Sequence, residues 1–256
     1  VDEYAQLTGD STGAAFTGKS IEHGGSEGRD AATGRGGVIV LKTLREIEGK
    51  STEPLSYAIQ GYGNVGTFFA EVAEAECPGW KLVAATDSSG GVYHERGLSA
   101  KSLTEWKSDR KHLHEYGTGT KITNEEFLEL EVDVLILAAL GSVVTEANED
   151  KINAKYILEL ANGPVDSSAE AGLNARGIQV VPDILANAGG VIVSYLEWLQ
   201  NLKNEHWPLA KVNNLLEEHL VAATKDIAGR AIKDGSTLKE AAFVVATERI
   251  VSSTKV

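Results

Sequence analysis

Short runs of consecutive apolar residues, separated by stretches with a helical pattern, constrain the fold of this chain more than any other feature. A strand that is apolar along its whole length is buried on both faces, whereas a half-exposed strand alternates apolar and polar residues. Such runs occur at Leu55–Gln60, Lys81–Asp87, Val132–Ala139, Tyr156–Ala161 and Ile178–Pro182. They predict an α/β fold in which a doubly wound, mainly parallel sheet is flanked by helices on both sides.

The segments between these runs are typical of helices. Apolar residues recur at every third position from Val38 to Ile47, and Gly49 then supplies a stop signal. The sequence from Thr123 to Glu126 matches a capping box that opens a short helix. Further helices are predicted at Asn64–Ala75, Leu98–Trp106 and Ser167–Arg176, and throughout the chain from Asn187 to its end.

The remaining segments are predicted to be loops. Residues 1–28 form a loop after a short helix, Ser88–Gly91 forms a turn, and His112–Gly119 is irregular. No repeat, low-complexity tract or linker interrupts the chain, so we expect residues 1–256 to form one domain. Its core covers about residues 50–190, and its helical flanks cover about residues 30–49 and 187–256.

The charge balance limits the possible ligands. The formal net charge is −13, from 24 basic and 37 acidic residues. This composition argues against nucleic-acid binding, which needs a basic patch for the phosphates. An anionic small molecule needs local donors, because the average field of the protein repels it. No apolar run of about eighteen residues occurs, so we predict no membrane span.

The cysteine, histidine and methionine content adds little about chemistry. Cys77 is the only cysteine, which excludes an intrachain disulfide and agrees with a reducing compartment. We interpret it as a small buried residue. The histidines lack metal-ligand spacing, so no metal site is predicted. The chain starts at Val1 and contains no methionine, so we expect an excised domain, a partial sequence or a processed product.

A glycine-rich turn carries the first functional signal. Gly61, Gly63 and Gly66 fit the pattern G-x-G-x-x-G, which lies directly between a predicted strand and a predicted helix. In a Rossmann-like fold the first glycine permits the tight turn, the second lets a pyrophosphate approach the backbone, and the third allows close packing of helix and strand. The helix N-terminus then offers free N–H groups to the phosphates. An ordinary glycine turn is the alternative interpretation.

Asp87 ends the second predicted strand, where a dinucleotide-binding fold places an acidic residue against the adenosine ribose. Asp87 also suits a cap on the turn that follows it, and the two roles are compatible. A carboxylate repels a 2′-phosphate, so Asp87 favours NAD over NADP. The neighbouring Ser88 and Ser89 weaken that preference.

Asn187, Val191 and Ser194 are spaced four and three residues apart, which predicts that they share one helical face. Gly189 and Gly190 leave the start of this helix without side chains, although glycine in a helix costs roughly 1 kcal/mol relative to alanine. The pair suits either the flat approach of a nicotinamide ring or helix–helix packing.

Several motifs together resemble a known family. They are Gly24–Arg29, Ala32–Gly36, Gly61–Gly66, Ala138–Leu140, Ala161–Pro164, Pro182–Val191 and Ser194–Trp198. From Val1 to about Arg249 the chain resembles the C-terminal NAD(P)-binding domain of glutamate dehydrogenases. Branched-chain and phenylalanine dehydrogenases share the fold but look different around Gly28–Gly36 and Val193–Trp198, so glutamate is the favoured substrate.

The resemblance implies roles for particular residues. It implies two substrate-binding residues at the distal carboxylate of L-glutamate, Val191 and Ser194. The implied cofactor-binding residues are Arg29, Thr33, Gly61, Gly63, Asn64, Val65, Gly66, Asp87, Ser88, Ala139, Asn162 and Asn187. Arg29 and Thr33 are expected near the nicotinamide, and Asn187 at the nicotinamide and its ribose. For Arg35, a role at the site and a role as a surface charge are equally open interpretations.

The resemblance also implies an activity: NAD(P)-dependent interconversion of L-glutamate with 2-oxoglutarate and ammonia, by a cytoplasmic hexamer. Its catalytic lysine and aspartate belong to a substrate domain that no part of this chain resembles. We therefore predict that this chain binds the cofactor but is inactive alone. The alternatives are a domain of a branched-chain or aromatic amino-acid dehydrogenase, and a non-catalytic dinucleotide-binding module.

Overall fold

The computed structural model describes residues 2–254 and is built around a single seven-stranded sheet. The strands are β1 Leu55–Gln60, β2 Trp80–Asp87, β3 Gly90–Tyr93, β4 Thr120–Ile122, β5 Val132–Leu137, β6 Ala154–Glu159 and β7 Gln179–Val181. Their order in the sheet is β4-β3-β2-β1-β5-β6-β7. The strands from β2 to β7 in this order pair in parallel, whereas β3 pairs antiparallel with both β2 and β4. The prediction of a mainly parallel sheet is confirmed.

The antiparallel edge was not predicted. Gly90 and Gly91, which the sequence assigns to a turn, instead begin β3 and pair with the end of β2. A Cβ atom at Gly91 would lie 2.1 Å from the carbonyl oxygen of Ala85, so only glycine fits this pairing. Strands this short, one of them starting with two glycines, lack the apolar run by which the longer strands are recognised.

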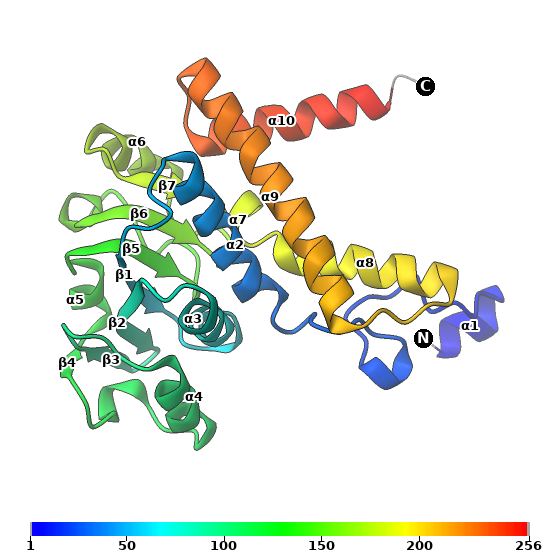
Figure 1. Ribbon diagram of the computed structural model, residues 1–256, viewed down its shortest axis with the longest axis horizontal. Helices are drawn as coiled ribbons and strands as arrows, with labels where there is room; N and C mark the ends of the chain where they lie inside the picture. Colours follow the sequence, from blue (N-terminus) through cyan, green and yellow to red (C-terminus); the bar gives the residue numbers. More distant parts are fainter. Residues whose placement is uncertain (1, 255–256) are drawn as a thin grey trace.

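Helices cover both faces of the sheet (Figure 1). They are α1 Asp2–Thr8, α2 Ala32–Ile47, α3 Asn64–Glu76, α4 Ala100–Ser108, α5 Asn124–Leu128, α6 Ser167–Ala175, α7 Asp183–Ala186, α8 Gly189–Lys203, α9 Leu209–Asp234 and α10 Leu238–Ser253. Short 3₁₀ helices lie at Ile21–His23, Leu113–Glu115 and Glu149–Lys151. The predicted capping box of Thr123 and Glu126 opens α5, with both of its hydrogen bonds formed. Helix α7 was not predicted.

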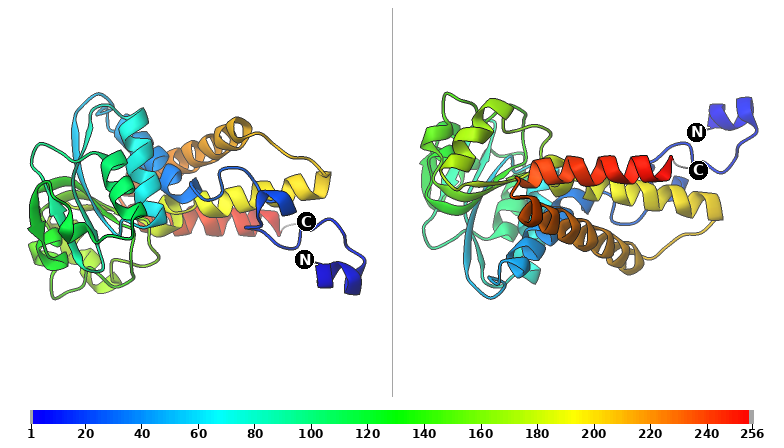
Figure 2. Two further views of the ribbon diagram at one scale, coloured as in Figure 1. Left: turned by 90° about the horizontal axis from the view of Figure 1, so that it is seen from below. Right: turned by 90° about the horizontal axis from the view of Figure 1, so that it is seen from above.

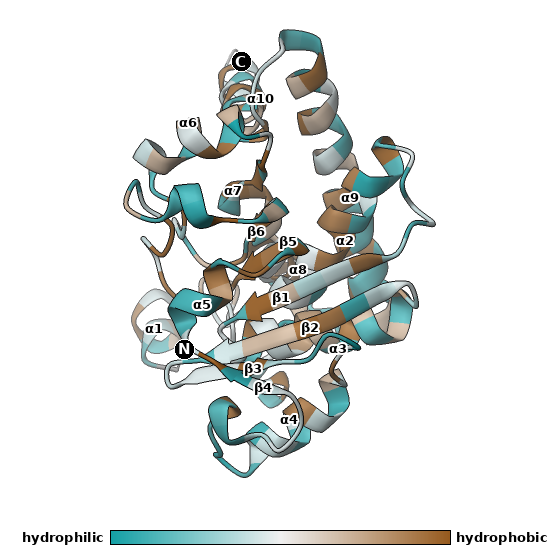
Figure 3. Ribbon diagram, turned by 90° about the vertical axis from the view of Figure 1, so that its left-hand side faces the viewer, coloured by the Kyte–Doolittle hydropathy of each residue, from teal (hydrophilic) through white to brown (hydrophobic). Residues whose placement is uncertain are grey.

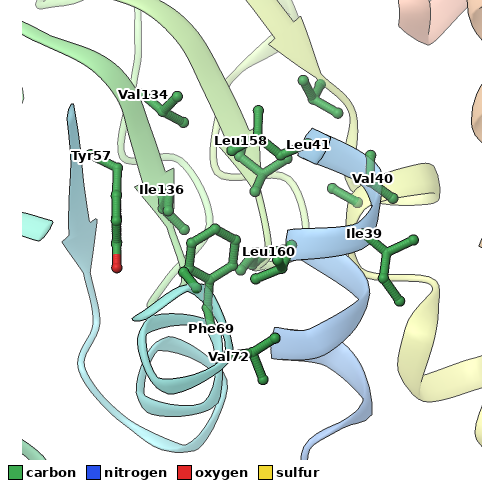
Figure 4. Close-up of a cluster of buried hydrophobic side chains, with 14 of the residues drawn as sticks. Ile39, Val40, Leu41, Tyr57, Phe69, Val72, Val134, Ile136, Leu158 and Leu160 are labelled. Atoms are coloured by element: carbon green, nitrogen blue, oxygen red, sulfur yellow. The ribbon is translucent and has the colours of Figure 1, made fainter. Parts of the chain in front are cut away.

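The central strands contribute side chains to two separate apolar layers. On β5, Val134 and Ile136 pack with α2 and α3, as Figure 4 shows for Phe69 and the neighbouring side chains. Leu135 and Leu137 belong to the opposite layer, which includes residues of α5 and α6. Figure 3 shows hydrophobic residues along the central strand β5. Burial on both faces explains why these strands have continuous apolar sequences.

The last three long helices extend away from the sheet to one side (Figure 2). The segment before α2 runs along α8 and is bonded to it through Glu197, whose side chain is fully buried. The Glu197 carboxylate accepts a hydrogen bond from the Gly18 backbone N–H at 2.9 Å and pairs with the Lys19 ammonium at 2.6 Å. None of the helices within residues 2–254 combines the length and the hydropathy that a membrane crossing requires.

Helix α2 crosses α3 and α8 at positions without side chains. A Cβ atom at Gly34 would lie 2.6 Å from the backbone nitrogen of Phe69 in α3. A Cβ atom at Gly189, at the start of α8, would lie 2.1 Å from the carbonyl oxygen of Ala32. The structure thus shows close helix–helix packing at Gly189, which is one of the two explanations for this residue.

Candidate functional site

The three glycines of the turn between β1 and α3 have different surroundings. Gly61 has a φ of 91°, and a Cβ atom there would lie 2.7 Å from the Cβ atom of Ala139. A Cβ atom at Gly66 would lie 2.4 Å from the carbonyl oxygen of Gly61. At Gly63 a Cβ atom would meet no atom within 4 Å. The fold itself therefore requires Gly61 and Gly66, while the space over Gly63 is open to a ligand.

Helix α3 begins at this open space without a side-chain cap. Its first turn starts with the hydrogen bond from the Thr67 N–H to the Gly63 carbonyl at 2.9 Å. The preceding N–H groups of the first turn, from Asn64 to Gly66, have no acceptor within the helix. They carry the positive end of the helix dipole and favour an anion.

Two unsatisfied polar atoms lie beside this turn. Gln60 Oε1 and Thr86 Oγ1, near the ends of β1 and β2, are buried and have no hydrogen-bond partner among residues 2–254. The turn follows β1, which lies between β2 and β5 in the sheet. The chain continues from β1 through β2 to one edge of the sheet and only then returns to β5 on the other side of β1, so the strand order reverses beside β1. Ligands of open α/β sheets bind at such a point. The open glycine and the uncapped helix fit a dinucleotide pyrophosphate.

Asp87, at the end of β2, has more protein partners than the sequence suggests. Its Oδ1 accepts hydrogen bonds from the Ser89 N–H at 2.9 Å and from the Ser89 hydroxyl at 2.5 Å, which is the turn-capping role. Its Oδ2 pairs with the Lys107 ammonium at 2.6 Å and accepts from the Leu113 N–H at 3.1 Å. Partial burial alone would raise the pKa of Asp87, but these donors hold it well below its usual value.

Lys107 is a site residue that sequence reasoning missed. It lies on α4, twenty positions after Asp87, and only its proximity in the fold pairs the two. The ammonium offsets the negative charge that was expected to repel a 2′-phosphate. Ser88, the other residue predicted here, is exposed.

The loops after β6 and β7 bring two predicted cofactor residues into contact. The Asn187 side-chain amide donates a hydrogen bond to Asn162 Oδ1 at 2.8 Å. Asn187 ends α7 and precedes α8, so the prediction that it belongs to the same helix as Ser194 is wrong. The short helix α7 intervenes because Asp183 begins a turn of helix directly after β7.

A second group forms where the start of α2 meets α8. Arg29 Nε donates a hydrogen bond to Ser194 Oγ at 2.9 Å. A Cβ atom at Gly190 would lie 2.9 Å from Thr33 Oγ1 and 3.3 Å from the Arg29 guanidinium. Three predicted site residues, Arg29, Thr33 and Ser194, thus converge around Gly190. Val191 is 73% exposed and projects into solvent.

One link joins this group to the glycine turn. The Asn64 side-chain amide donates to the carbonyl oxygen of Asp30, next to Arg29, at 2.8 Å. Val65 lies against α2, where its carbonyl oxygen is 2.7 Å from the position that a Cβ atom at Gly34 would take. Arg35 pairs with Glu76 on the surface at 2.8 Å, which supports its interpretation as a surface charge.

Comparison with known proteins agrees with this arrangement. The family described as Glutamate/Leucine/Phenylalanine/Valine dehydrogenase matches residues 24–256. This chain belongs to that family. Its members use NAD(P), and the chain accordingly has the fold of an NAD(P)-binding Rossmann domain of an oxidoreductase.

Individual relatives are glutamate dehydrogenases. The chain is 41% identical over 255 residues to glutamate dehydrogenase from Thermotoga maritima, a match that covers 100% of this chain and 61% of the relative. The hetero-hexameric glutamate dehydrogenase from Thermus thermophilus, solved in a leucine-bound form, superimposes with a TM-score of 0.89 at 32% identity, over 99% of this chain and 60% of that one. The glutamate dehydrogenase from Peptoniphilus asaccharolyticus gives 0.86 at 35% identity, over 100% of this chain and 60% of that one. The chain therefore spans about three fifths of the length of these relatives, as expected for the C-terminal NAD(P)-binding part.

Other reactive groups of this dehydrogenase-family chain lie apart from the site. Within the part of the chain that the structure describes, no three His, Cys, Asp or Glu side chains are grouped to hold a metal ion. Cys77 is buried, and its burial raises the pKa of the thiol, which disfavours the reactive thiolate. The interpretation of Cys77 as a small buried residue is confirmed.

Proposed function

We propose that this chain is the cofactor-binding domain of a glutamate dehydrogenase and that it holds the pyrophosphate of NAD(P) over Gly63. The observation that carries the proposal is the open space at Gly63, between two glycines that the fold itself needs and at an uncapped helix end. The membership of the dehydrogenase family supports the same ligand. We further propose that residues 1–256 act as one domain.

The residues of this chain bind and orient the cofactor. When bound, NAD(P) supplies a nicotinamide ring that exchanges a hydride with the α-carbon of an amino acid. Arg29 and Thr33, at the Gly190 backbone, form one wall beside this ring. The bonded pair of Asn162 and Asn187 offers polar groups to the nicotinamide and its ribose. Positioning of this kind contributes a large part of enzymatic rate enhancement.

We propose L-glutamate and 2-oxoglutarate as the substrates. The support is the identity of 41% to a glutamate dehydrogenase along the whole chain. Ser194 lies beside the positively charged Arg29, which suits a carboxylate better than an apolar side chain. Val191, exposed on the adjoining turn of α8, would complete the contact. A branched-chain or aromatic amino-acid dehydrogenase is the alternative within the family.

Kinetics of a complete enzyme containing this chain test the substrate assignment. We expect Ser194→Ala to raise KM for glutamate several-fold and to leave KM for the cofactor nearly unchanged. A larger effect on the cofactor would move Ser194 to the nucleotide side. A panel of leucine, valine, phenylalanine and glutamate then distinguishes the family members.

We also propose that this chain alone does not turn over. The resemblance implies that the acid–base groups belong to a substrate domain, and this chain covers only 61% of its glutamate dehydrogenase relative. Loss of such groups costs on the order of 10²–10⁴ in rate. The hexameric assembly and the cytoplasmic location stay predictions of the resemblance. Calorimetric titration with NADH, beside an assay of NADH oxidation with 2-oxoglutarate and ammonium, tests the proposal. Binding without turnover is expected; turnover would mean that the proton-transfer residues lie within this chain, and absence of binding would contradict the cofactor role.

A further inference from the structure

Glu159 is a buried carboxyl group that neither the motif analysis nor the proposed reaction uses. It is the last residue of β6, and only 1% of its surface is exposed. A carboxyl group is costly to bury unless hydrogen bonds compensate it. Its partners therefore indicate what it does.

The two oxygens of Glu159 hold two different loops. Oε1 accepts a hydrogen bond from the Val165 N–H at 3.1 Å, directly after the loop that contains Asn162. Oε2 accepts from the Asp183 N–H at 2.9 Å, at the start of the helix that leads to Asn187. One side chain thus fixes the loop after β6 to the loop after β7.

A second layer of hydrogen bonds joins the same loops. The Asp183 carboxylate accepts from the Gly163 N–H at 2.9 Å. The hydrogen bond from the Asn187 amide to Asn162 Oδ1 is a further connection between the two loops. The geometry depends on Glu159, because the backbone at Val165 and Asp183 sets where both loops begin and end.

We propose that Glu159 is a positioning residue for the nicotinamide end of the cofactor, because its carboxylate joins the two loops that carry Asn162 and Asn187. This inference rests on the proposed cofactor role. It goes beyond that role because it makes the polar wall at the nicotinamide dependent on one buried group that does not touch the ligand. The adenosine end, at Gly63 and Asp87, lies on other loops and is independent of Glu159.

The protonation of Glu159 adds a pH dependence. Burial raises the pKa of the Glu159 carboxyl to about 7, and the adjacent Asp183 carboxylate adds to the rise. The two backbone N–H donors and the Lys239 ammonium, which is itself paired with Glu170, act in the opposite direction. When one oxygen carries a proton, it accepts poorly from the N–H that faces it. Both hydrogen bonds from the loops to Glu159 therefore form above this pKa, and one of them is weakened below it.

Binding of NADH and of ADP to variants at pH 8 tests the proposal, since ADP lacks the nicotinamide riboside. Glu159→Gln removes one acceptor, and Glu170→Gln is the matched control that removes a nearby charge without a bond to either loop. We expect Glu159→Gln to weaken NADH binding about tenfold, equivalent to about 1.4 kcal/mol or one hydrogen bond, and to leave ADP binding unchanged. The control should change neither ligand.

The results separate this inference from the proposed function. If the unchanged chain bound neither ADP nor NADH, the cofactor role would fail and the inference with it. If the unchanged chain bound both ligands, but Glu159→Gln weakened both equally or neither, only the positioning role would be overturned. A merely structural role predicts equal weakening, in parallel with a lower melting temperature.

A pH profile of NADH affinity provides a second measurement, which remains available if Glu159→Gln does not fold. Between pH 8.5 and pH 6 the affinity of the unchanged chain should fall about fivefold, because about one tenth of the carboxyls stay ionised one pH unit below the pKa. The profile of a folded Glu159→Gln variant should be level over this range. A level profile for the unchanged chain would overturn the positioning role.

Discussion

Because the space over Gly63 is open, one added methyl group at this position should change ligand binding and leave the stability of the fold nearly unchanged. Gly63→Ala adds a Cβ atom that meets no atom within 4 Å, on a backbone with φ of −96° and ψ of −153°. Alanine is a poorer N-cap than glycine by roughly 0.5 to 1 kcal/mol. It also restricts the unfolded chain, which returns about 0.4 to 1 kcal/mol. The two effects nearly cancel, so we expect a melting temperature within about 2 °C of the unchanged chain.

The matched control is the same substitution three residues later. A Cβ atom at Gly66 would lie 2.4 Å from the Gly61 carbonyl oxygen, far inside van der Waals contact, so the start of α3 must shift. Overpacking of this kind costs about 1 to 3 kcal/mol. Gly66→Ala should therefore lower the melting temperature by several degrees.

Melting scans without ligand and calorimetric titration with NADH measure the two effects. Gly63→Ala should melt normally and bind NADH at least tenfold more weakly, because the methyl group occupies the path of the pyrophosphate to the backbone N–H groups. Unchanged NADH affinity in Gly63→Ala would refute the assignment of this space to the pyrophosphate. A large loss of stability in that variant would refute the argument that the space is open.

Three further predictions concern ion pairs. Lys107→Ala should weaken NADPH binding about tenfold more than NADH binding, because it exposes the negative charge of Asp87; equal effects in paired titrations would exclude Lys107 from cofactor discrimination. Because the folded-state pKa of Asp87 is depressed, its stabilisation is present above pH about 4 and is lost as the pH falls through lower values. Asp87→Asn should then show a smaller loss in urea midpoint between pH 7 and pH 3, and an identical loss would contradict this. Glu197→Ala leaves the buried Lys19 ammonium unpaired and should lower the free energy of unfolding by about 3 to 5 kcal/mol in urea titration, whereas a loss below about 1 kcal/mol would mean that the pair is solvated.

Local sequence signals predicted the parts of the fold that depend on local physics. Strand β1 has the predicted bounds, because a continuous apolar run of that length is determined by burial on both faces. The capping box of α5 forms as predicted, because its partners are three residues apart. The glycine turn was located with its flanking strand and helix for the same reason.

The rest depends on contacts between distant segments. Lys107 meets Asp87 only through the placement of α4 beside the end of β2, and no spacing rule encodes that contact. Glu159 ends an ordinary apolar strand, and its partners are backbone N–H groups, which have no sequence signature. Gly189 was assigned equally to ligand approach or packing, because the sequence does not reveal that Ala32 of α2 lies against it.

The crossings of α2 determine how this part of the fold can move. At Gly34 and at Gly189 the backbones of adjacent helices touch without intervening side chains, so no layer of rotamers is available to absorb sliding. The pyrophosphate turn on α3 and Ser194 on α8 therefore translate and rotate as one body with α2. Any large movement of this body must therefore be a hinge rotation about segments outside the three helices. A mutation at either crossing would change the alignment of the two ends of the cofactor relative to each other, even if both binding surfaces kept every side chain.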